Sequence, residues 1–310
     1  MIQSVTDAVT GAIAVLLSRC HAGVTRLRAV AATLVSATLG AIGFLTRLPV
    51  GTTDCHWMAF RRQPAAMVPV AIALGAILAV PLVVGLPAPT AAFCVPIWLV
   101  LWTGITHLDG LADLADAAVV HGDATRRRSV MRDTTVGVGA VAAATIAIAG
   151  LVLAAHTLAD VPSRVAFAVV VVAEVSAKLG MVAIAALGSA THEGLGSALV
   201  DDTGPLTFVV GLAWIPPVTV GLWWIGGESV AIAAVVALGV ALASTGALFL
   251  WARRNLGGVS GDVFGATNEL ARLAALHAGL LVWTHVLADT TVTFASAELF
   301  ASLEVFGWTL

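Results

Sequence analysis

The amino-acid sequence predicts an all-α protein, a polytopic transmembrane helix bundle with about seven to eight spans. Of its 310 residues, 59% are hydrophobic and only 11% are charged, and the mean hydropathy is +1.01. A soluble domain carries about 25% charged residues, so this composition is typical of a chain that folds in a bilayer. Apolar runs of about 20 residues, long enough to cross a hydrocarbon core, recur along the chain. They lack the alternation of a β-barrel strand, and a helix satisfies its own backbone hydrogen bonds in lipid.

The spans are expected wherever such an apolar run occurs. The first run, at 29–45, is the weakest candidate for a crossing. The other seven predicted spans comprise residues 65–86, 90–108, 135–156, 163–187, 206–225, 229–251 and 271–288.

The placement of arginine predicts which side each polar segment faces. If every run from residue 65 onward crosses once, four polar segments emerge on the same face: 46–64, 109–134, 188–205 and 252–270. They hold nine arginines, whereas the short connectors of the opposite face hold only Arg164. By the positive-inside rule the arginine-rich face is cytoplasmic. Because Arg19, Arg26 and Arg28 would fall on the wrong side if 29–45 crossed, we expect that run to be re-entrant or partly interfacial.

Two other features restrict the partners. The run of three arginines at 126–128 is short, lacks interleaved aromatic residues and lies beside a predicted span. We expect it to orient the protein and contact phospholipid, with a grip on substrate phosphates as the alternative, and we expect no nucleic-acid partner. The three cysteines show no paired spacing, so neither a disulfide framework nor a zinc site is indicated.

Three aspartates stand close together in the stretch HLDGLADLADA, residues 107–117. Asp109, Asp113 and Asp116 are spaced i, i+4, i+7, which places them on one helix face if the span ending near Leu108 continues into the loop. Like charges at this spacing repel each other, so a cation is expected among them. Oxygen-rich clusters suit Mg²⁺ or Mn²⁺, which bind substrate phosphates with their remaining positions. The plainer alternative is a solvated helix end that meets the arginines at 126–132.

A glycine-rich segment, RRNLGGVSGDVFGATNEL at 253–270, lies on the same predicted face. Glycines let backbone N–H groups approach a phosphate closely, and helix N-termini favour anions. Small residues in membrane helices usually serve packing, so this segment alone is a weak signal. Two further segments of this face are MRDTTVGVGA at 131–140, with Asp133 just before a span, and THEGLGSALVDD at 191–202, with His192 and Glu193.

Taken in order, these segments resemble the cobalamin synthase family, adenosylcobinamide-GDP ribazoletransferase. The segments that carry the resemblance are GFLTRLPV (43–50), HLDGLADLAD (107–116), MRDTTVGVGA (131–140), EGLG (193–196) and LGGVSGDVFGATNEL (256–270). Five motifs in the right order, within residues 40–290, make the resemblance specific. It implies a Mg²⁺-dependent membrane enzyme, with Mn²⁺ as a substitute. The enzyme would join adenosylcobinamide-GDP to α-ribazole or its 5′-phosphate and release GMP.

The resemblance also implies roles for single residues. The metal ligands would be Asp109, Asp113, Asp116 and Asp262. The catalytic groups would be the three aspartates of 109–116 with His107 and Asp133, although a lone histidine at a helix end is more often structural. The substrate-binding residues would be Arg47, Arg132, Lys178, His192, Glu193, Gly257, Gly258, Gly261, Asp262 and Glu269. The family's usual arginine before EGLG is replaced here, so His192, Lys178 and the 126–128 run are the candidates for the missing cation.

The domain organisation follows from the same reasoning. We expect an N-terminal extension at 1–28 with an interfacial helix, a single membrane-embedded catalytic domain at 29–290, and a C-terminal tail at 291–310 with another interfacial helix. The protein would be integral to the cell membrane, with its active site at the cytoplasmic face. Besides the lipid bilayer and the substrates, the expected partners are a second copy of the chain or other enzymes of nucleotide-loop assembly.

Two rival functions remain open at this point. The CDP-alcohol phosphotransferases share a similar run of aspartates, but their pattern usually places Ala-Arg where Asp113 follows Ala112 here. An ion-coupled transporter would show broken helices and acids near mid-span. In this chain only Glu174 and Lys178 fall inside a predicted span away from its first residues, and their i, i+4 spacing is that of an internal ion pair.

Overall fold

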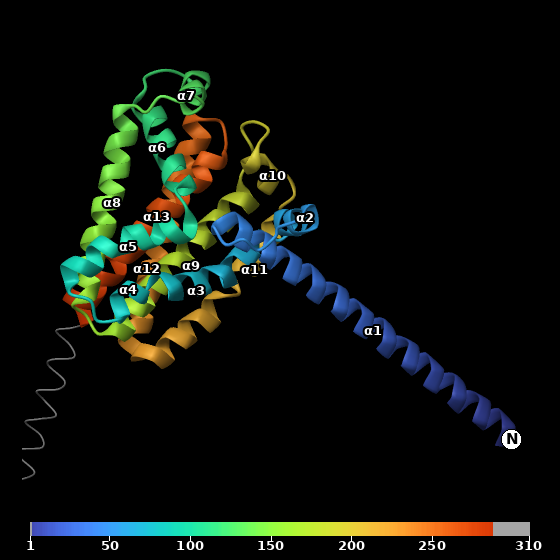
Figure 1. Ribbon diagram of the computed structural model, residues 1–310. Coiled ribbons are helices and arrows are strands. Elements are labelled where there is room, and N and C mark those ends of the chain that lie inside the picture. The colour runs from blue at the N-terminus through green and yellow to red at the C-terminus, as the bar shows by residue number, and fades with distance from the viewer. Residues whose placement is uncertain (1, 288–310) are drawn as a thin grey trace, which may run out of the picture.

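The computed structural model describes residues 2–287 as a bundle of α-helices (Figure 1), which confirms the predicted fold class. An isolated bridge between Ala190 and Val259 is the one β-type pairing within these residues. The C-terminal tail expected at 291–310 lies outside the described residues. The helices are α1 (Ile2–Leu45), α2 (Asp54–Arg62), η1 (Pro64–Ala66), α3 (Met67–Leu78), α4 (Val80–Val83), α5 (Ala88–Thr103), α6 (Thr106–Val119), α7 (Ala124–Met131), α8 (Val138–Ala159), α9 (Ser163–Leu187), α10 (Leu195–Asp201), α11 (Pro205–Leu212), α12 (Ile215–Asn255), α13 (Gly261–Leu281) and η2 (Val282–Leu287).

Within the described residues, four helical stretches are long and apolar enough to cross a membrane. They are His21–Leu45, Val138–Ala159, Ser163–Leu187 and Pro205–Asn255. The pair α5 and α6 would count as a fifth span only as one broken unit, because the two helices meet at a bend of 101°. The apolar runs therefore make fewer straight spans than the sequence suggested.

The differences have local causes. The predicted span at 65–86 is divided into η1, α3 and α4, with Ala79 outside the helices. The runs at 206–225 and 229–251 fall in the α11–α12 segment, and α12 is kinked at Gly227, where φ is 77°. Only glycine adopts that conformation readily, so it marks the break. The run at 271–288 falls in α13 and η2, and α13 already begins at Gly261 and carries three charged residues.

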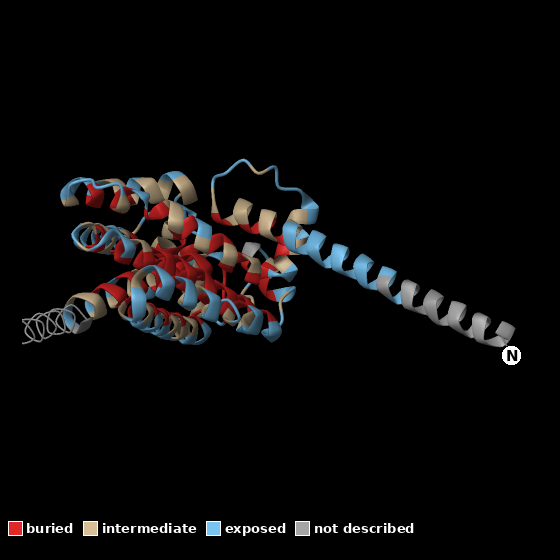
Figure 2. Cartoon of the chain, turned by 90° about the horizontal axis from the view of Figure 1, so that it is seen from below, coloured by how far each residue is buried: buried red, intermediate tan, exposed pale blue. Residues whose placement is uncertain are grey.

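In the N-terminal region, one continuous helix, α1, leads from Ile2 to Leu45. A straight helix does not form a re-entrant loop at 29–45, whereas a partly interfacial position of that run and an interfacial helix at 1–28 stay predictions. The alanine-rich sequence of α1 favours helix throughout, so nothing stops the helix at residue 28. Figure 2 shows α1 projecting from the bundle; its residues 21–35 are exposed, and apolar residues become buried toward its end, at Ala37, Ala41 and Leu45.

Helix α9 forms the centre of the bundle. In its most apolar stretch, 94% of the residues are buried, and α9 packs against α3, α12 and α13. Figure 2 shows the buried residues concentrated in the middle of the bundle. Because α9 is surrounded on all sides, it is the fixed element against which the other helices are placed.

Glycines bring α6 and α13 together backbone to backbone. A Cβ atom added at Gly110 would lie 2.9 Å from the Cα of Asp262, and one added at Gly265 would lie 2.9 Å from the carbonyl oxygen of His107. Real Cβ atoms do not come so close, so only glycine permits this approach. The two segments that the sequence singled out for their acids and glycines therefore lie side by side.

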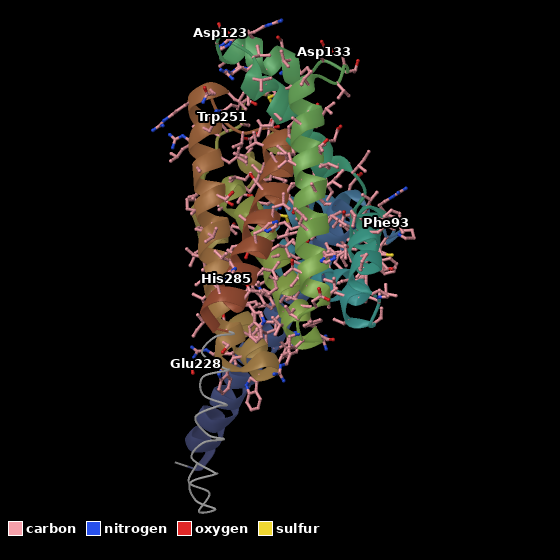
Figure 3. The ribbon with its side chains drawn as sticks, turned by 90° about the vertical axis from the view of Figure 1, so that its left-hand side faces the viewer. Phe93, Asp123, Asp133, Glu228, Trp251 and His285 are labelled. Atoms are coloured by element: carbon pink, nitrogen blue, oxygen red, sulfur yellow. The ribbon has the colours of Figure 1, made fainter. Side chains whose placement is uncertain are left out.

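The two ends of the bundle differ in character. Figure 3 shows Asp123 and Asp133, on either side of α7, at one end, and Glu228, beside the kink of α12, at the other. Trp251, near the C-terminal end of α12, lies toward the first end. The site described below is formed where α6, α10 and the start of α13 meet (Figure 1).

Candidate active site

The α6 helix carries three aspartates with graded exposure. The i, i+4, i+7 face is present, but α6 does not continue the span before it, because the chain turns sharply through Gly104 at φ 73°. Asp109 is exposed, Asp113 is half-buried and Asp116 is buried. The face therefore leads from the surface into the protein.

Asp116 is directed toward α8 rather than toward its neighbours. Its two carboxylate oxygens accept hydrogen bonds from the backbone N–H groups of Gly137 at 2.7 Å and Ala140 at 2.8 Å. The first N–H groups of a helix have no partner within the helix, so the carboxylate satisfies two of them at the start of α8. We assign Asp116 to anchoring α8, a role that the sequence pattern did not indicate.

Asp262 approaches the α6 aspartates from α13. It lies in the first turn of that helix, and the Ser260 hydroxyl donates to its carboxylate at 3.2 Å. Asp109 and Asp262 both act electrostatically on Asp113, and Asp109 also acts on Asp262. Burial raises the pKa of Asp262, and the Asp109 carboxylate acts in the same direction. The result is a carboxylate cluster from two helices, Asp109, Asp113 and Asp262, which we call the acidic cluster.

The donor set of the acidic cluster fits a hard cation. Its ligands are carboxylate oxygens, the kind that Mg²⁺ and Mn²⁺ prefer. Within residues 2–287, no three His, Cys, Asp or Glu side chains converge closely enough to hold a metal ion unaided. Mg²⁺ commonly takes one or two carboxylates and completes its shell with water and substrate phosphates.

Two loops are joined beside the acidic cluster. Val259 donates to the carbonyl of Ser189 at 2.8 Å, and Thr191 donates to the carbonyl of Val259 at 3.0 Å. A Cβ atom at Gly196 would lie 2.7 Å from the backbone nitrogen of Gly261, so the two loops pack without side chains between them. This brings exposed His192 within electrostatic range of Asp262.

The glycine-rich loop before α13 contains backbone conformations that favour glycine. Gly257 and Gly258 have positive φ values of 81° and 157°, and Gly261, the first residue of α13, is exposed. Glu193, in the partner loop, is also exposed. Gly257 and Gly261 are thus exposed next to the start of a helix, where anions are favoured, whereas residues 258–260 between them are buried.

A hollow of about 290 Å³ opens next to Asp262. His107 forms part of its wall and is 8% exposed, with its ring edge-on to Phe44 at 6.2 Å between centroids. One part of the lining is polar and the other is apolar. The lining residues are Gly43, Phe44, Thr106, His107, Gly196, Leu199, Gly261, Asp262 and Phe264.

Two arginines of the 126–128 run stabilise helix ends. Arg127 donates to the carbonyls of Ala117 at 2.7 Å and Ala118 at 3.1 Å, and Arg128 donates to the carbonyl of Leu256 at 2.6 Å. These contacts satisfy carbonyls at the ends of α6 and α12, so both side chains hold the structure together around the site.

The exposed cations and Asp133 lie in the surrounding loops. The Arg47 side chain is exposed and lies beside Gly104, at the bend before α6. Arg132 is exposed at the end of α7. The backbone N–H and the hydroxyl of Thr135 hold the pKa of Asp133 below its ordinary value, at 3.0 and 2.8 Å from its Oδ1 atom. Asp133 is thus a loop carboxylate with local partners.

Lys178 and Glu269 are buried inside the bundle. Lys178 is 0% exposed and forms an ion pair with Glu174, as its i, i+4 spacing predicted. The Glu269 carboxylate accepts from Arg272 at 2.6 Å. Both residues act electrostatically on His107 in the wall of the hollow, and their contact with substrate stays a prediction. Sequence reasoning missed Arg272, although an arginine in a predicted span is costly and signals a buried partner.

Comparison with known proteins decides the family. Residues 37–280 match the family described as Cobalamin-5-phosphate synthase. The chain belongs to this family. A family member from Halorubrum lacusprofundi, named adenosylcobinamide-GDP ribazoletransferase, is 42% identical over 259 residues, which cover 81% of this chain and 99% of that protein. A relative of the same name from Haloquadratum walsbyi is 41% identical, again over 81% of this chain and 99% of that protein.

Further relatives extend the cobalamin-5-phosphate synthase family beyond these organisms. One from Methanocella arvoryzae, also named adenosylcobinamide-GDP ribazoletransferase, is 35% identical over 82% of this chain and 98% of that protein. No solved structure matches the chain. The resemblance found in the sequence is confirmed, and the protein is a transferase of cobalamin synthesis. Broken helices, which the transporter alternative predicted, do occur at Gly104 and Gly227, but the family match decides against that alternative.

Proposed function

We propose that this protein transfers the cobinamide phosphate of adenosylcobinamide-GDP to a hydroxyl of α-ribazole, or of its 5′-phosphate, at a Mg²⁺ site on the acidic cluster. The observation that carries the proposal is the approach of Asp262 on α13 to Asp109 and Asp113 on α6. Neither helix alone encloses a diphosphate. Together they present carboxylates on one side and glycine N–H groups on the other.

The reaction is a substitution at phosphorus. The ribazole hydroxyl oxygen forms a bond to the corrinoid-side phosphorus, the bond from that phosphorus to the bridging oxygen breaks, and GMP leaves. Positioning and electrostatic stabilisation supply most of the catalysis in such reactions. Mg²⁺ or Mn²⁺, held by one or two of the carboxylates of Asp109, Asp113 and Asp262 together with substrate phosphate oxygens, would neutralise charge on the diphosphate.

The hollow beside Asp262 supports a place for the attacking nucleoside. Phe44, Leu199 and Phe264 provide an apolar side that suits the flat heterocycle of ribazole, while His107 and Asp262 border the polar side. His107 is the group placed to accept the proton of a hydroxyl bound there. Arg47, beside the bend before α6, and His192, within electrostatic range of Asp262, are exposed and would contact the nucleotide.

The decisive experiment uses the detergent-purified protein with adenosylcobinamide-GDP, α-ribazole and Mg²⁺, and measures GMP release. We expect GMP to appear, Mn²⁺ to replace Mg²⁺, and EDTA to abolish turnover, because the site offers carboxylate oxygens. Undiminished turnover in excess EDTA would contradict the metal assignment, and absence of GMP with every metal would contradict the function.

The orientation of the site is part of the proposal. The arginine-rich segments support a cytoplasmic active site. Single cysteines at 123 and 201, in a chain lacking Cys20, Cys55 and Cys94, should react with a membrane-impermeant thiol reagent only from the cytoplasmic side. A cysteine at 228, at the opposite end of the bundle (Figure 3), should react only from the other side. Labelling of 123 and 228 from the same side would contradict this orientation.

A further inference from the structure

Four charged side chains are buried together between α9 and α13, away from the acidic cluster. Glu174 and Lys178 lie on α9, Glu269 and Arg272 lie on α13, and none is more than 9% exposed. The two acids and two bases balance in charge, which is how a folded chain tolerates ions in its interior. We call this group the buried ion network.

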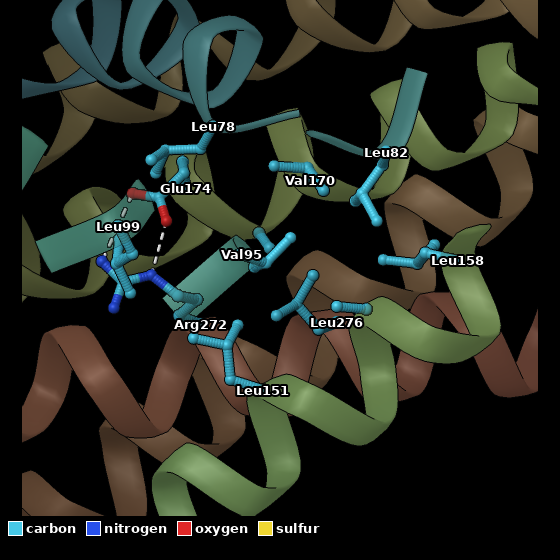
Figure 4. A pocket seen from close by; sticks show the side chains of 12 residues that line it. Leu78, Leu82, Val95, Leu99, Leu151, Leu158, Val170, Glu174, Arg272 and Leu276 are labelled. Carbon is cyan, nitrogen blue, oxygen red and sulfur yellow. Dashed lines mark hydrogen bonds and ion pairs between the residues drawn. The ribbon is translucent and has the colours of Figure 1, made fainter. Parts of the chain in front are cut away.

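One member of the network connects the two helices with a defined geometry. The Arg272 Nε atom donates to the Glu174 carboxylate at 2.5 Å, and Nη2 lies 3.5 Å from its other oxygen. Its Nη1 atom donates to Glu269 at 2.6 Å, and Glu269 also accepts from Asn268 at 2.9 Å. Figure 4 shows Arg272 reaching Glu174 at one side of an otherwise apolar cavity. A planar guanidinium held by two carboxylates has little freedom to shift.

This connection adds to the steric packing between α9 and α13. Small residues let the two helix backbones approach closely: Gly180 on α9 faces Thr267, and Gly279 on α13 faces Val169. The contact from Arg272 to Glu174 joins residues 98 positions apart in sequence. Because its geometry is defined, this contact favours one register of α13 along α9, the central helix.

The register of α13 along α9 also affects the position of Asp262 in the acidic cluster. Asp262 lies ten residues before Arg272 on the same helix, about 15 Å along its axis at 1.5 Å per residue. Asp262 lies directly against α6, because the two backbones touch at Gly110 and Gly265. A shift of α13 along α9 would therefore change the position of Asp262 relative to Asp109 and Asp113. Effects of this kind change rates because catalytic groups misplaced by about 1 Å lose much of their contribution.

We propose that Glu174 and Arg272 are positioning residues of the active site, and that their interhelical ion pair sets the distance between Asp262 and the α6 carboxylates. This inference rests on the proposed metal site. Neither residue touches substrate: both act through α13.

The test removes the α9 half of the network without leaving a buried charge. The double variant Glu174→Leu/Lys178→Met loses one acid and one base, and Arg272 keeps its partner Glu269. Glu174→Asp is a second variant that keeps the charge but shortens the side chain by one methylene, so it is expected to fold. Glu228→Gln is the control, because it removes an exposed carboxylate at the far end of the bundle (Figure 3).

Three measurements on each purified protein separate positioning from stability. They are the thermal unfolding temperature, the half-saturating Mn²⁺ concentration by electron paramagnetic resonance, and kcat and KM from GMP release. For both Glu174 variants we expect half-saturating Mn²⁺ to rise about tenfold and kcat to fall about tenfold. We expect KM to change far less, and Glu228→Gln to match the parent in all three measurements.

Specific results would overturn the inference. If either folded Glu174 variant binds Mn²⁺ and turns over like the parent, the buried ion network has no positioning role. A lower unfolding temperature with unchanged Mn²⁺ binding and kcat would likewise reduce it to a stabilising element. A parent protein that binds Mn²⁺ but releases no GMP would reject the proposed function, while the Mn²⁺ comparison would still judge the inference. A parent protein that releases GMP without binding Mn²⁺ would reject the metal site, and the comparison of kcat between the Glu174 variants and the parent would then judge the inference.

Discussion

Two helices of the bundle, α6 and α9, carry acidic side chains into it, and they differ in what compensates the charge. On α9, Glu174 is sealed from solvent between Lys178 and Arg272. On α6, Asp109 and Asp113 face a third carboxylate, Asp262, instead of a cation. The same chemical group is therefore structural where the protein supplies its counter-charge. Where the protein supplies more negative charge instead, our proposal is that an external cation provides the counter-charge.

The largest expected effect comes from removing a cation that neutralises the α9 carboxylate, so that the buried ion network, like the acidic cluster, has more acids than bases. Arg272→Met would leave the carboxylates of Glu174 and Glu269 buried without their shared cation. Removing one partner of a buried ion pair costs about 3–5 kcal/mol of unfolding free energy. Thermal or denaturant unfolding in detergent should show this loss. Arg254→Met, at an exposed position, is the control and should be nearly neutral. Equal stability of the two variants would break the comparison.

The next test removes charge from α6 and from the helix that opposes it. Asp113→Asn and Asp262→Asn nearly preserve side-chain shape, so both proteins should insert and purify. Each should lose on the order of 10² or more in rate of GMP release, as when a group that stabilises transition-state charge is deleted. Asp201→Asn, on an exposed residue outside the cluster, should cost far less. If Asp262→Asn retained near-normal turnover and Asp113→Asn did not, the site would be one-sided.

A third test separates α6 from α13 without changing any charge. Gly110→Ala places a methyl group 2.9 Å from the Cα of Asp262, so one backbone must move. Overpacking of this kind costs about 1–3 kcal/mol of stability, and turnover should fall because the acidic cluster opens. Gly246→Ala, where no atom lies within 4 Å of the added carbon, is the matched control. Unaltered turnover in Gly110→Ala would show that the backbone approach is not needed.

The smallest expected effect sharpens the comparison within α6 itself. Asp116→Asn replaces one of the two oxygens that accept from the start of α8, and helix-capping contacts are worth about 0.5–2 kcal/mol. Unfolding temperature should fall modestly. The Mg²⁺ concentration for half-maximal turnover should remain that of the parent protein. A large increase in that Mg²⁺ concentration would instead indicate that Asp116 is a metal ligand.

Much of the site was accessible to sequence reasoning because it depends on local spacing. The i, i+4, i+7 spacing placed Asp109, Asp113 and Asp116 on one helix face, and the i, i+4 spacing of Glu174 and Lys178 predicted their ion pair. The sequence singled out the glycines of the 257–261 loop for close approach to a phosphate, and the structure adds positive φ values at Gly257 and Gly258. Ordered motifs identified the family although no motif alone was sufficient.

Other features depended on distant segments. Spacing could not reveal that Asp116 binds the start of α8, because its partners lie 21 and 24 residues away. It could not pair Arg272 with Glu174 across 98 residues. Counting apolar runs also overlooked the bend between α5 and α6.

By itself, then, the sequence determined the membrane helix class, the helix faces that carry charge and the family. Composition and short-range periodicity are properties that each segment has alone. Tertiary structure decided which carboxylates cluster with one another and which bind an arginine or the start of a helix. Whether a carboxylate meets an arginine, a helix start or another carboxylate depends on which distant segment packs against it. The need for glycine at Gly110 and Gly265 becomes visible only when the backbones of α6 and α13 are seen in contact.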